Sequence, residues 1–159
     1  TITTKSTPRG IPHDPKARIL GACGHAGIFS TPIDISTFCK CLLSGKIISK
    51  DTLSLVCSSK YDTYVDEQHF GLLCYKKSTN QKKSEIPALF SDASFAISGF
   101  TGTYLLIDPE KKHFISINSN RIYNRCTSAE HTESDLICTK NYVYRKDALI
   151  NQIVSNEYC

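Results

Sequence analysis

The sequence predicts an α+β fold, in which a helical part precedes an antiparallel sheet and a last helix packs on that sheet. Three observations favour this order. Apolar residues follow a helical spacing between residues 31 and 58, short β-rich runs replace it near residue 69, and helical spacing returns from Thr132 onward. We therefore expect an extended loop over 1–30, part of a helical region over 31–68, and a sheet with its C-terminal helix over 69–159.

The first 24 residues are predicted to form a loop because they contain three prolines and three glycines. A helix is then expected over 32–44. Thr31 can cap it, Pro32 suits its first position, and Asp34 can complete a capping box. Gly45 follows as the terminating residue. The predicted buried stripe of this helix contains Ile35, Phe38, Cys39 and Leu42.

A second helix is expected over 50–57, after a Ser49 cap. Its predicted buried residues are Leu53, Val56 and Cys57. The period then changes, and four antiparallel strands are expected at 69–75, 93–98, 103–108 and 113–118. The last two strands are joined by the turn Asp108–Lys112, which predicts a hairpin.

The final helix is expected within 129–155, with an apolar stripe formed by Leu136, Val143, Ile150 and Ile153. A sheet covered by this helix alone would leave its other face open. An open apolar face needs a partner, so we expect an N-terminal segment or a second chain to complete the fold.

Composition excludes several classes of protein. The chain has 159 residues, 40% of them apolar, and no run approaches the roughly 20 apolar residues that span a bilayer. The first residues form no apolar leader, so we expect no signal peptide, and the compartment stays open. The net charge is +4, but the lysine pairs lie in or beside predicted turns, so we expect no nucleic-acid partner.

The eight cysteines do not form a recognisable metal motif. No Cys-x-x-Cys occurs, and Cys23-Gly24-His25 provides two ligands where zinc needs three or four. Several of the cysteines lie on apolar faces, where a free thiol behaves as a small apolar side chain. We expect no metal and no cofactor, and the redox state of the thiols stays open.

Two stretches carry a resemblance to a known family. The first contains RGIPHDP (9–15), LGACGHAGIFST (20–31), Asp34 and LLSG (42–45). The second contains SGFTGT (98–103), IDPE (107–110) and NSNR (118–121). Together and in this order, they resemble the C-terminal part of the β-lactamase-related serine hydrolases, which include class C β-lactamases, penicillin-binding proteins, D-alanyl-D-alanine carboxypeptidases and related esterases. The resemblance implies a β-lactamase/transpeptidase-like fold.

The family's chemistry requires residues that this chain lacks. A serine of a Ser-x-x-Lys motif forms an acyl-enzyme with an amide, β-lactam or ester, and the lysine helps to remove its proton. None of the 14 lysines here follows a serine by three positions, and no Tyr-x-Asn occurs. Tyr64-Val65-Asp66 matches Tyr-x-Asp, but it follows the place where the family carries that motif, so we treat it as chance. We therefore assign no catalytic residue.

The family's third motif, Lys-Thr-Gly or His-Thr-Gly, aligns with Ile97-Ser98-Gly99. Ser98 keeps a hydroxyl, and Gly99 keeps close backbone approach, whereas Ile97 cannot carry a charge. The Phe100 N–H matches the family's oxyanion donor. His25 lies in a loop that the resemblance places beside the active-site entrance, although a histidine that caps a turn is the more usual situation. The candidate substrate-binding residues are Ser98, Gly99, Phe100 and His25.

Three hypotheses remain open. In the first, the chain is the C-terminal segment of a serine hydrolase and is inactive alone. It binds a small-molecule or peptide substrate only when an N-terminal segment completes the fold. Alternatively, it is a degenerate, non-catalytic binding or interaction module of the same fold. The third hypothesis is an independent enzyme with a nucleophile that the spacing does not reveal.

Overall fold

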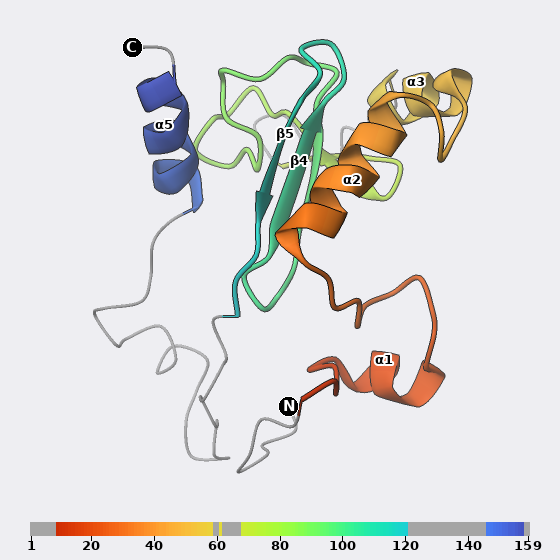
Figure 1. Ribbon diagram of the computed structural model, residues 1–159. Helices are drawn as coiled ribbons and strands as arrows, with labels where there is room; N and C mark the ends of the chain where they lie inside the picture. Colours follow the sequence, from red (N-terminus) through yellow and green to blue (C-terminus); the bar gives the residue numbers. More distant parts are fainter. Residues whose placement is uncertain (1–8, 59–60, 62–67, 121–145, 158–159) are drawn as a thin grey trace.

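The computed structural model describes residues 9–58, 61, 68–120 and 146–157. Its centre is an antiparallel sheet of five strands in the order β1-β2-β3-β4-β5 (Figure 1). The strands are β1 (His69–Gly71), β2 (Cys74–Lys76), β3 (Phe95–Ser98), β4 (Tyr104–Asp108) and β5 (His113–Ile117). Since each strand pairs with the next along the chain, the predicted antiparallel sheet and the α+β class are confirmed.

Three of the four predicted strands are confirmed as β3, β4 and β5, but the single strand predicted over 69–75 is wrong. This segment is a hairpin, in which Gly71 of β1 pairs with Cys74 of β2. The two-residue turn between them contains Leu73 at a φ of 56°. Because the turn residues are both leucines, the run shows none of the usual turn-forming residues.

The helix α2 (Pro32–Leu43) begins as its sequence predicts. Thr31 Oγ1 accepts a hydrogen bond from the Asp34 N–H at 3.2 Å and donates one to Asp34 Oδ2 at 2.9 Å. Gly45 follows the helix at a φ of 78°, a conformation that favours glycine. Cys39 and Leu42 are buried as predicted, whereas Phe38 is 43% exposed because it borders a groove described below.

The helix α3 (Lys50–Ser58) begins after the predicted cap, since Ser49 Oγ accepts the Thr52 N–H at 3.1 Å. Leu53 is buried, while Val56 and Cys57 are half-buried. The short helix α1 (Pro15–Leu20) lies within the segment for which the sequence predicted a loop. It forms because Asp14 Oδ1 accepts the Ala17 N–H at 2.8 Å and caps the turn.

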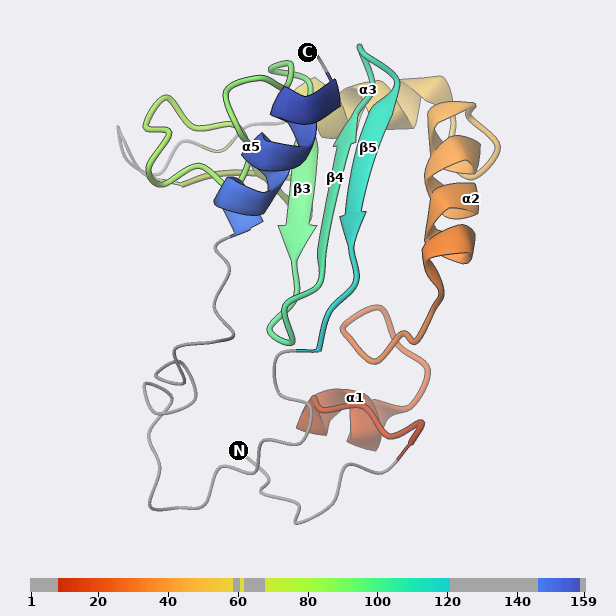
Figure 2. The ribbon, with the colours of Figure 1, turned by 60° about the vertical axis from the view of Figure 1, so that its left-hand side comes forward.

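The helix α5 (Lys146–Glu157) packs on one face of the sheet, as the sequence predicts (Figure 2). Ile150 and Val154 are buried there, whereas Ile153 is 42% exposed, so the stripe runs through Val154 instead. Leu136 and Val143 lie outside the described residues. This core cluster consists of Ile86, Phe90, Ala96, Tyr104, Leu106, Ile150 and Val154.

The opposite face of the sheet is covered in part, whereas the sequence-based expectation left it open. The helix α2 covers part of it, and Cys39 and Leu42 pack with Ile107 of β4 (Figure 2). The sequence did not predict that α2 would cover this face, because a helix that precedes the sheet in the chain can fold back onto either face. Among the described residues, no helix combines the length and the apolar character needed to cross a bilayer.

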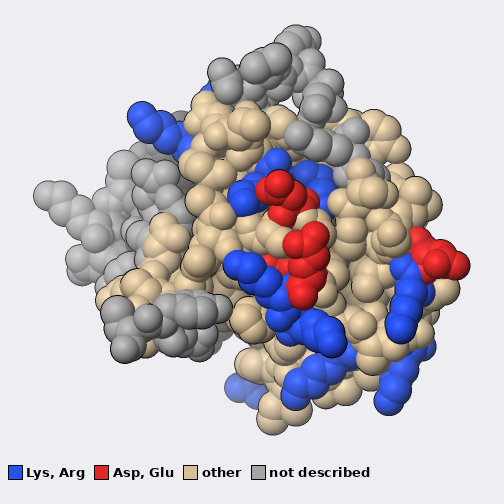
Figure 3. Space-filling view, turned by 90° about the horizontal axis from the view of Figure 1, so that it is seen from above, with Lys and Arg blue, Asp and Glu red and all other residues tan. Residues whose placement is uncertain are grey.

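Charges of both signs mix on the end of the molecule seen from above. Figure 3 shows Lys and Arg side chains around a central group of Asp and Glu side chains. Among the described residues, Lys77 forms an ion pair with Asp92 at 3.3 Å and donates to the Phe90 carbonyl at 2.7 Å.

Candidate functional site

The strand β3 carries the predicted third motif, and its alternation sends neighbouring side chains to opposite faces. Ile97 lies on the face of α2 and is 52% exposed. Ser98 lies on the face of α5, where its hydroxyl donates a hydrogen bond to Glu85 Oε2 at 3.1 Å. The structure thus brings a carboxylate, which sequence reasoning missed, to the position beside Ser98.

Glu85 belongs to the long connection between β2 and β3, and its backbone is held on both sides. Its N–H donates to Gln68 Oε1 at 2.9 Å, and its carbonyl accepts the Tyr104 hydroxyl at 2.6 Å. Tyr104 is 2% exposed, and burial raises its pKa well above the ordinary value. The phenol therefore stays protonated and keeps donating to Glu85 at neutral pH.

The turn after β3 depends on Gly99. Its N–H donates to the Thr103 carbonyl at 2.9 Å, and the Gly102 N–H donates to the Gly99 carbonyl at 3.0 Å. A Cβ atom on Gly99 would collide with Thr103 Oγ1. The Thr103 side chain therefore lies close against the Gly99 backbone, and the turn leads the chain directly from β3 into β4.

Phe100 lies at the tip of this turn and is 47% exposed. Its ring stacks on the imidazole of His13, with centroids 5.3 Å apart and an interplanar angle of 8°. His13 belongs to the RGIPHDP stretch, so the stack joins the two stretches of the sequence that carry the family resemblance. No spacing in the sequence could have indicated this pair, because 86 positions separate its members.

His25 contacts Asp14 rather than the third motif. Its Nε2 lies 3.4 Å from Asp14 Oδ2, and about half of its side chain is exposed. The Ala17 N–H, and then the charge of His25, hold the pKa of Asp14 below its ordinary value. His25 therefore supports the cap of α1.

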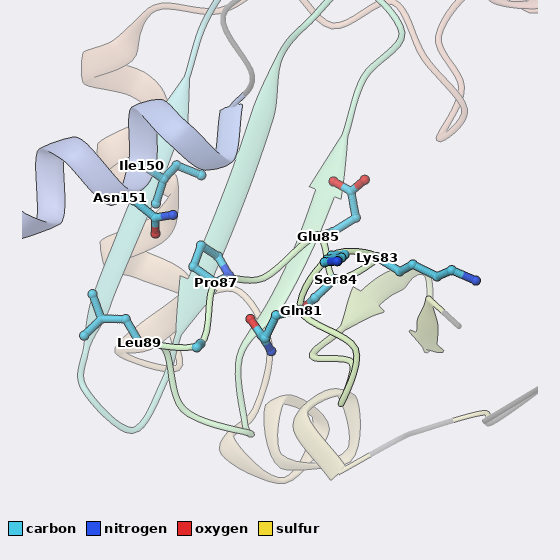
Figure 4. Close-up of a pocket in the computed structure, with 10 residues that line it drawn as sticks. Gln81, Lys83, Ser84, Glu85, Pro87, Leu89, Ile150 and Asn151 are labelled. Carbon is cyan, nitrogen blue, oxygen red and sulfur yellow. The ribbon is translucent and has the colours of Figure 1, made fainter. Parts of the chain in front are cut away.

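Two hollows flank the motif. A cavity of about 620 Å³ lies between α5 and the loop before β3 (Figure 4). Its lining consists of Gln81, Lys82, Lys83, Ser84, Glu85, Pro87, Ala88, Leu89, Ile150 and Asn151. A groove of about 190 Å³ lies on the other face and is lined by apolar side chains, including Phe38, Leu73, Ile97 and Leu105.

The described thiols are all free, and burial raises the pKa of three of them, Cys39, Cys57 and Cys74. A raised pKa lowers the fraction of reactive thiolate. Within the part of the chain that the structure describes, no group of three or more His, Cys, Asp or Glu side chains could hold a metal ion.

The chain is similar to one curated protein, from Escherichia coli O157:H7, whose name is "Putative D-alanyl-D-alanine carboxypeptidase". The two are 29% identical over 124 residues, which cover 73% of this chain and 28% of the E. coli protein. The chain thus spans little more than a quarter of that relative. No family model matches the chain, and no solved structure matches it at a significant level. The similarity supports a relationship to the D-alanyl-D-alanine peptidases and β-lactamases at most.

Proposed function

We propose that this chain is the C-terminal segment of a β-lactamase-like serine hydrolase, and that Ser98, Gly99 and Phe100 line the site of its acyl substrate. The observation that carries the proposal is the turn at Gly99. A Cβ atom at Gly99 would meet the Thr103 hydroxyl, so a bare backbone suits the turn after β3, at the position where the resemblance implies close approach to a substrate. The weak similarity to a carboxypeptidase supports the same reaction class.

The segment alone should have no acyl-transfer activity. Acylation needs a nucleophile and a base within hydrogen-bond reach of each other, and the chain contains no Ser-x-x-Lys. The hydroxyl of Ser98 does have a carboxylate partner at 3.1 Å. However, the resemblance aligns Ser98 with the family's third motif, which contacts the substrate and does not provide the nucleophile. Ser98 is therefore a substrate-binding residue in this proposal.

The test is incubation of the chain with a fluorescent penicillin and with a nitrophenyl ester, followed by measurement of the intact mass. We expect no adduct. A stable, stoichiometric adduct on any serine would overturn the proposal and favour an independent enzyme, with Ser98 and Glu85 as the first pair to examine.

The second arm fuses the chain to the upstream part of the E. coli relative, provided that part contains a Ser-x-x-Lys. Labelling of its serine is expected if the chain completes a hydrolase, and a serine-to-alanine change in that motif is the matched control. If the fusion folds but stays unlabelled, the chain is the alternative, a non-catalytic binding module. The neutral Ile97, in place of the usual cation, is the observation that favours this alternative.

A further inference from the structure

The RGIPHDP stretch meets the proposed substrate site through His13. The imidazole stacks on the ring of Phe100, with centroids 5.3 Å apart and an interplanar angle of 8°. Figure 2 shows that α1, which follows this stretch directly, lies beyond the end of the sheet at which β3 leads into β4. The stack therefore joins the tip of the turn that carries Phe100 to a segment outside the sheet.

The backbone on both sides of His13 is held in place. Asp14 caps α1, since its Oδ1 accepts the Ala17 N–H at 2.8 Å. On the other side, a Cβ atom on Gly27 would stand 3.1 Å from both Pro12 Cγ and Ala17 Cβ, so the bare backbone of residue 27 packs closely against both. His13 itself is half-buried. Its ring is therefore presented at a defined place, as a group that positions another must be.

The turn on the other side of the stack is fixed at its base by hydrogen bonds. The Gly99 N–H donates to the Thr103 carbonyl at 2.9 Å, and the Gly102 N–H donates to the Gly99 carbonyl at 3.0 Å. Ser119 Oγ donates to the Gly102 carbonyl at 2.8 Å. Phe100 lies at the tip between these bonds, and its side chain is 47% exposed. A contact that fixes its ring therefore also restricts the short stretch of backbone that carries it.

We propose that His13 is a positioning residue, whose ring fixes the turn of residues 99–102 and with it the backbone of Phe100. Stacked aromatic rings attract each other beyond the effect of the area that they bury. The inference rests on the proposed function, in which the Phe100 N–H aligns with the family's oxyanion donor. Such a donor is effective only when its direction is fixed before the reaction. His13 acts through Phe100 and needs no contact with the substrate.

The first measurement is the NMR order parameter of backbone N–H bonds in the full chain. We expect the Phe100 N–H to be rigid in the parent chain, with a value of about 0.85, and to fall below about 0.6 in His13→Ala. The N–H of Leu106, a buried residue of β4, should stay rigid in both proteins. A change confined to the turn then separates loss of the stack from a general loosening of the fold.

Two further variants identify the ring as the cause. His13→Phe keeps an aromatic ring and removes both nitrogens, so it should preserve the order of the Phe100 N–H. His13→Gln keeps a hydrogen-bonding side chain without a ring, so it should behave like His13→Ala. His113→Ala is the matched control, because His113 is exposed and pairs with Asp108, at the other end of the β4–β5 pair from the turn. It should change nothing at Phe100.

The second measurement is the rate at which the fluorescent penicillin labels the fused protein described above. We expect His13→Ala to lower the limiting rate at least about tenfold, because a misplaced donor raises the barrier to acyl transfer. The penicillin concentration that gives half of this rate should change by less than about twofold, since His13 does not touch the substrate. His13→Phe should restore the rate.

The proposal is overturned if the Phe100 N–H is equally ordered in the parent chain and in His13→Ala, if His13→Gln restores the order that His13→Phe does not, or if the His13→Ala fusion is labelled at the parent rate. A parent fusion that folds but is never labelled contradicts the proposed function instead. In that case the order parameters alone decide whether His13 positions the turn. The two ideas can therefore fail separately.

Discussion

Gly99 and Thr103 lie so close together that the Thr103 hydroxyl occupies the space in which a Cβ atom on residue 99 would stand. The same two residues are joined through the backbone, since the Gly99 N–H donates to the Thr103 carbonyl at 2.9 Å. The turn that presents Phe100 to His13 therefore depends on the absence of a side chain at residue 99.

We expect Gly99→Ala to lower the free energy of unfolding by about 1–3 kcal/mol, because the added methyl must displace Thr103 or the backbone. Urea denaturation measures the change. Gly24→Ala is the matched control, since a Cβ atom at residue 24 would meet no atom within 4 Å. The double variant Gly99→Ala with Thr103→Ala should recover most of the loss, because the nearest remaining side-chain atom, the Thr103 Cβ, lies at an ordinary contact distance of 3.6 Å. Equal losses in the single and double variants would show that the clash is not the cause.

The sequence predicted the parts of the fold that depend on local signals. The cap at Thr31 and the hairpin turn after Asp108 were correct because neighbouring residues determine them. The turn at Leu73 was missed, because leucine is an unusual residue at positive φ and nothing nearby indicates it. The helix α1 was missed because its six residues are too short to show a helical period.

The buried carboxylate of Asp108 provides a second prediction. Burial alone would raise its pKa, but hydrogen bonds from the backbone and hydroxyl of Ser91, at 2.8 and 2.7 Å, and from the Lys111 N–H hold the pKa below its ordinary value. We expect Asp108→Asn to cost about 1–3 kcal/mol at pH 7, because an amide NH₂ cannot accept the bonds of one carboxylate oxygen. Asp92→Asn, at an exposed acid, is the control and should cost little.

The cost of Asp108→Asn should depend on pH with a defined sign. A lowered pKa in the folded state stabilises the protein above the unfolded value, near 3.8, and this contribution is lost as the pH falls through the folded value. The difference in unfolding free energy between the parent and Asp108→Asn is therefore expected to be constant above about pH 5 and to shrink below about pH 4. A difference that grew in acid would contradict the assignment.

In the candidate site too, the sequence predicted local features and missed contacts between distant residues. Ser98, Gly99 and Phe100 were found because they form one short motif. Their partners Glu85 and His13 were not found, because each lies at least 13 positions from the residue that it contacts. Glu85 belongs to no motif, and His13 lies in the other stretch that carries the resemblance, so neither contact follows from a local spacing.

The apolar groove beside Ile97 predicts self-association. Although α2 covers part of this face, Leu73 is 95% exposed and Ile97 is 52% exposed. Exposed apolar groups that share one groove favour association with another apolar surface. We expect the chain to form dimers or larger species at high concentration, and the double variant Leu73→Ser with Ile97→Ser to reduce them in sedimentation velocity. Ile28→Ser is the control, because Ile28 is 86% exposed but does not line the groove. A monomeric parent chain at every concentration would contradict the prediction.

The helix α5 should stabilise the fold through the side that faces the sheet, which carries Ile150. Ile150 is 1% exposed and packs with Tyr104 and Leu106 of β4, whereas Ile153, three positions later, is 42% exposed. We expect Ile150→Ala to lower the free energy of unfolding by about 2–5 kcal/mol, because it leaves a cavity against the sheet. Ile153→Ala removes the same atoms from a half-solvated position and gains helix propensity, so its effect should stay within about 1 kcal/mol. Urea denaturation of the two variants measures the contrast directly. If both variants lost the same small amount, α5 would not be packed on the sheet, and the cavity between α5 and Glu85 would lose one of its walls.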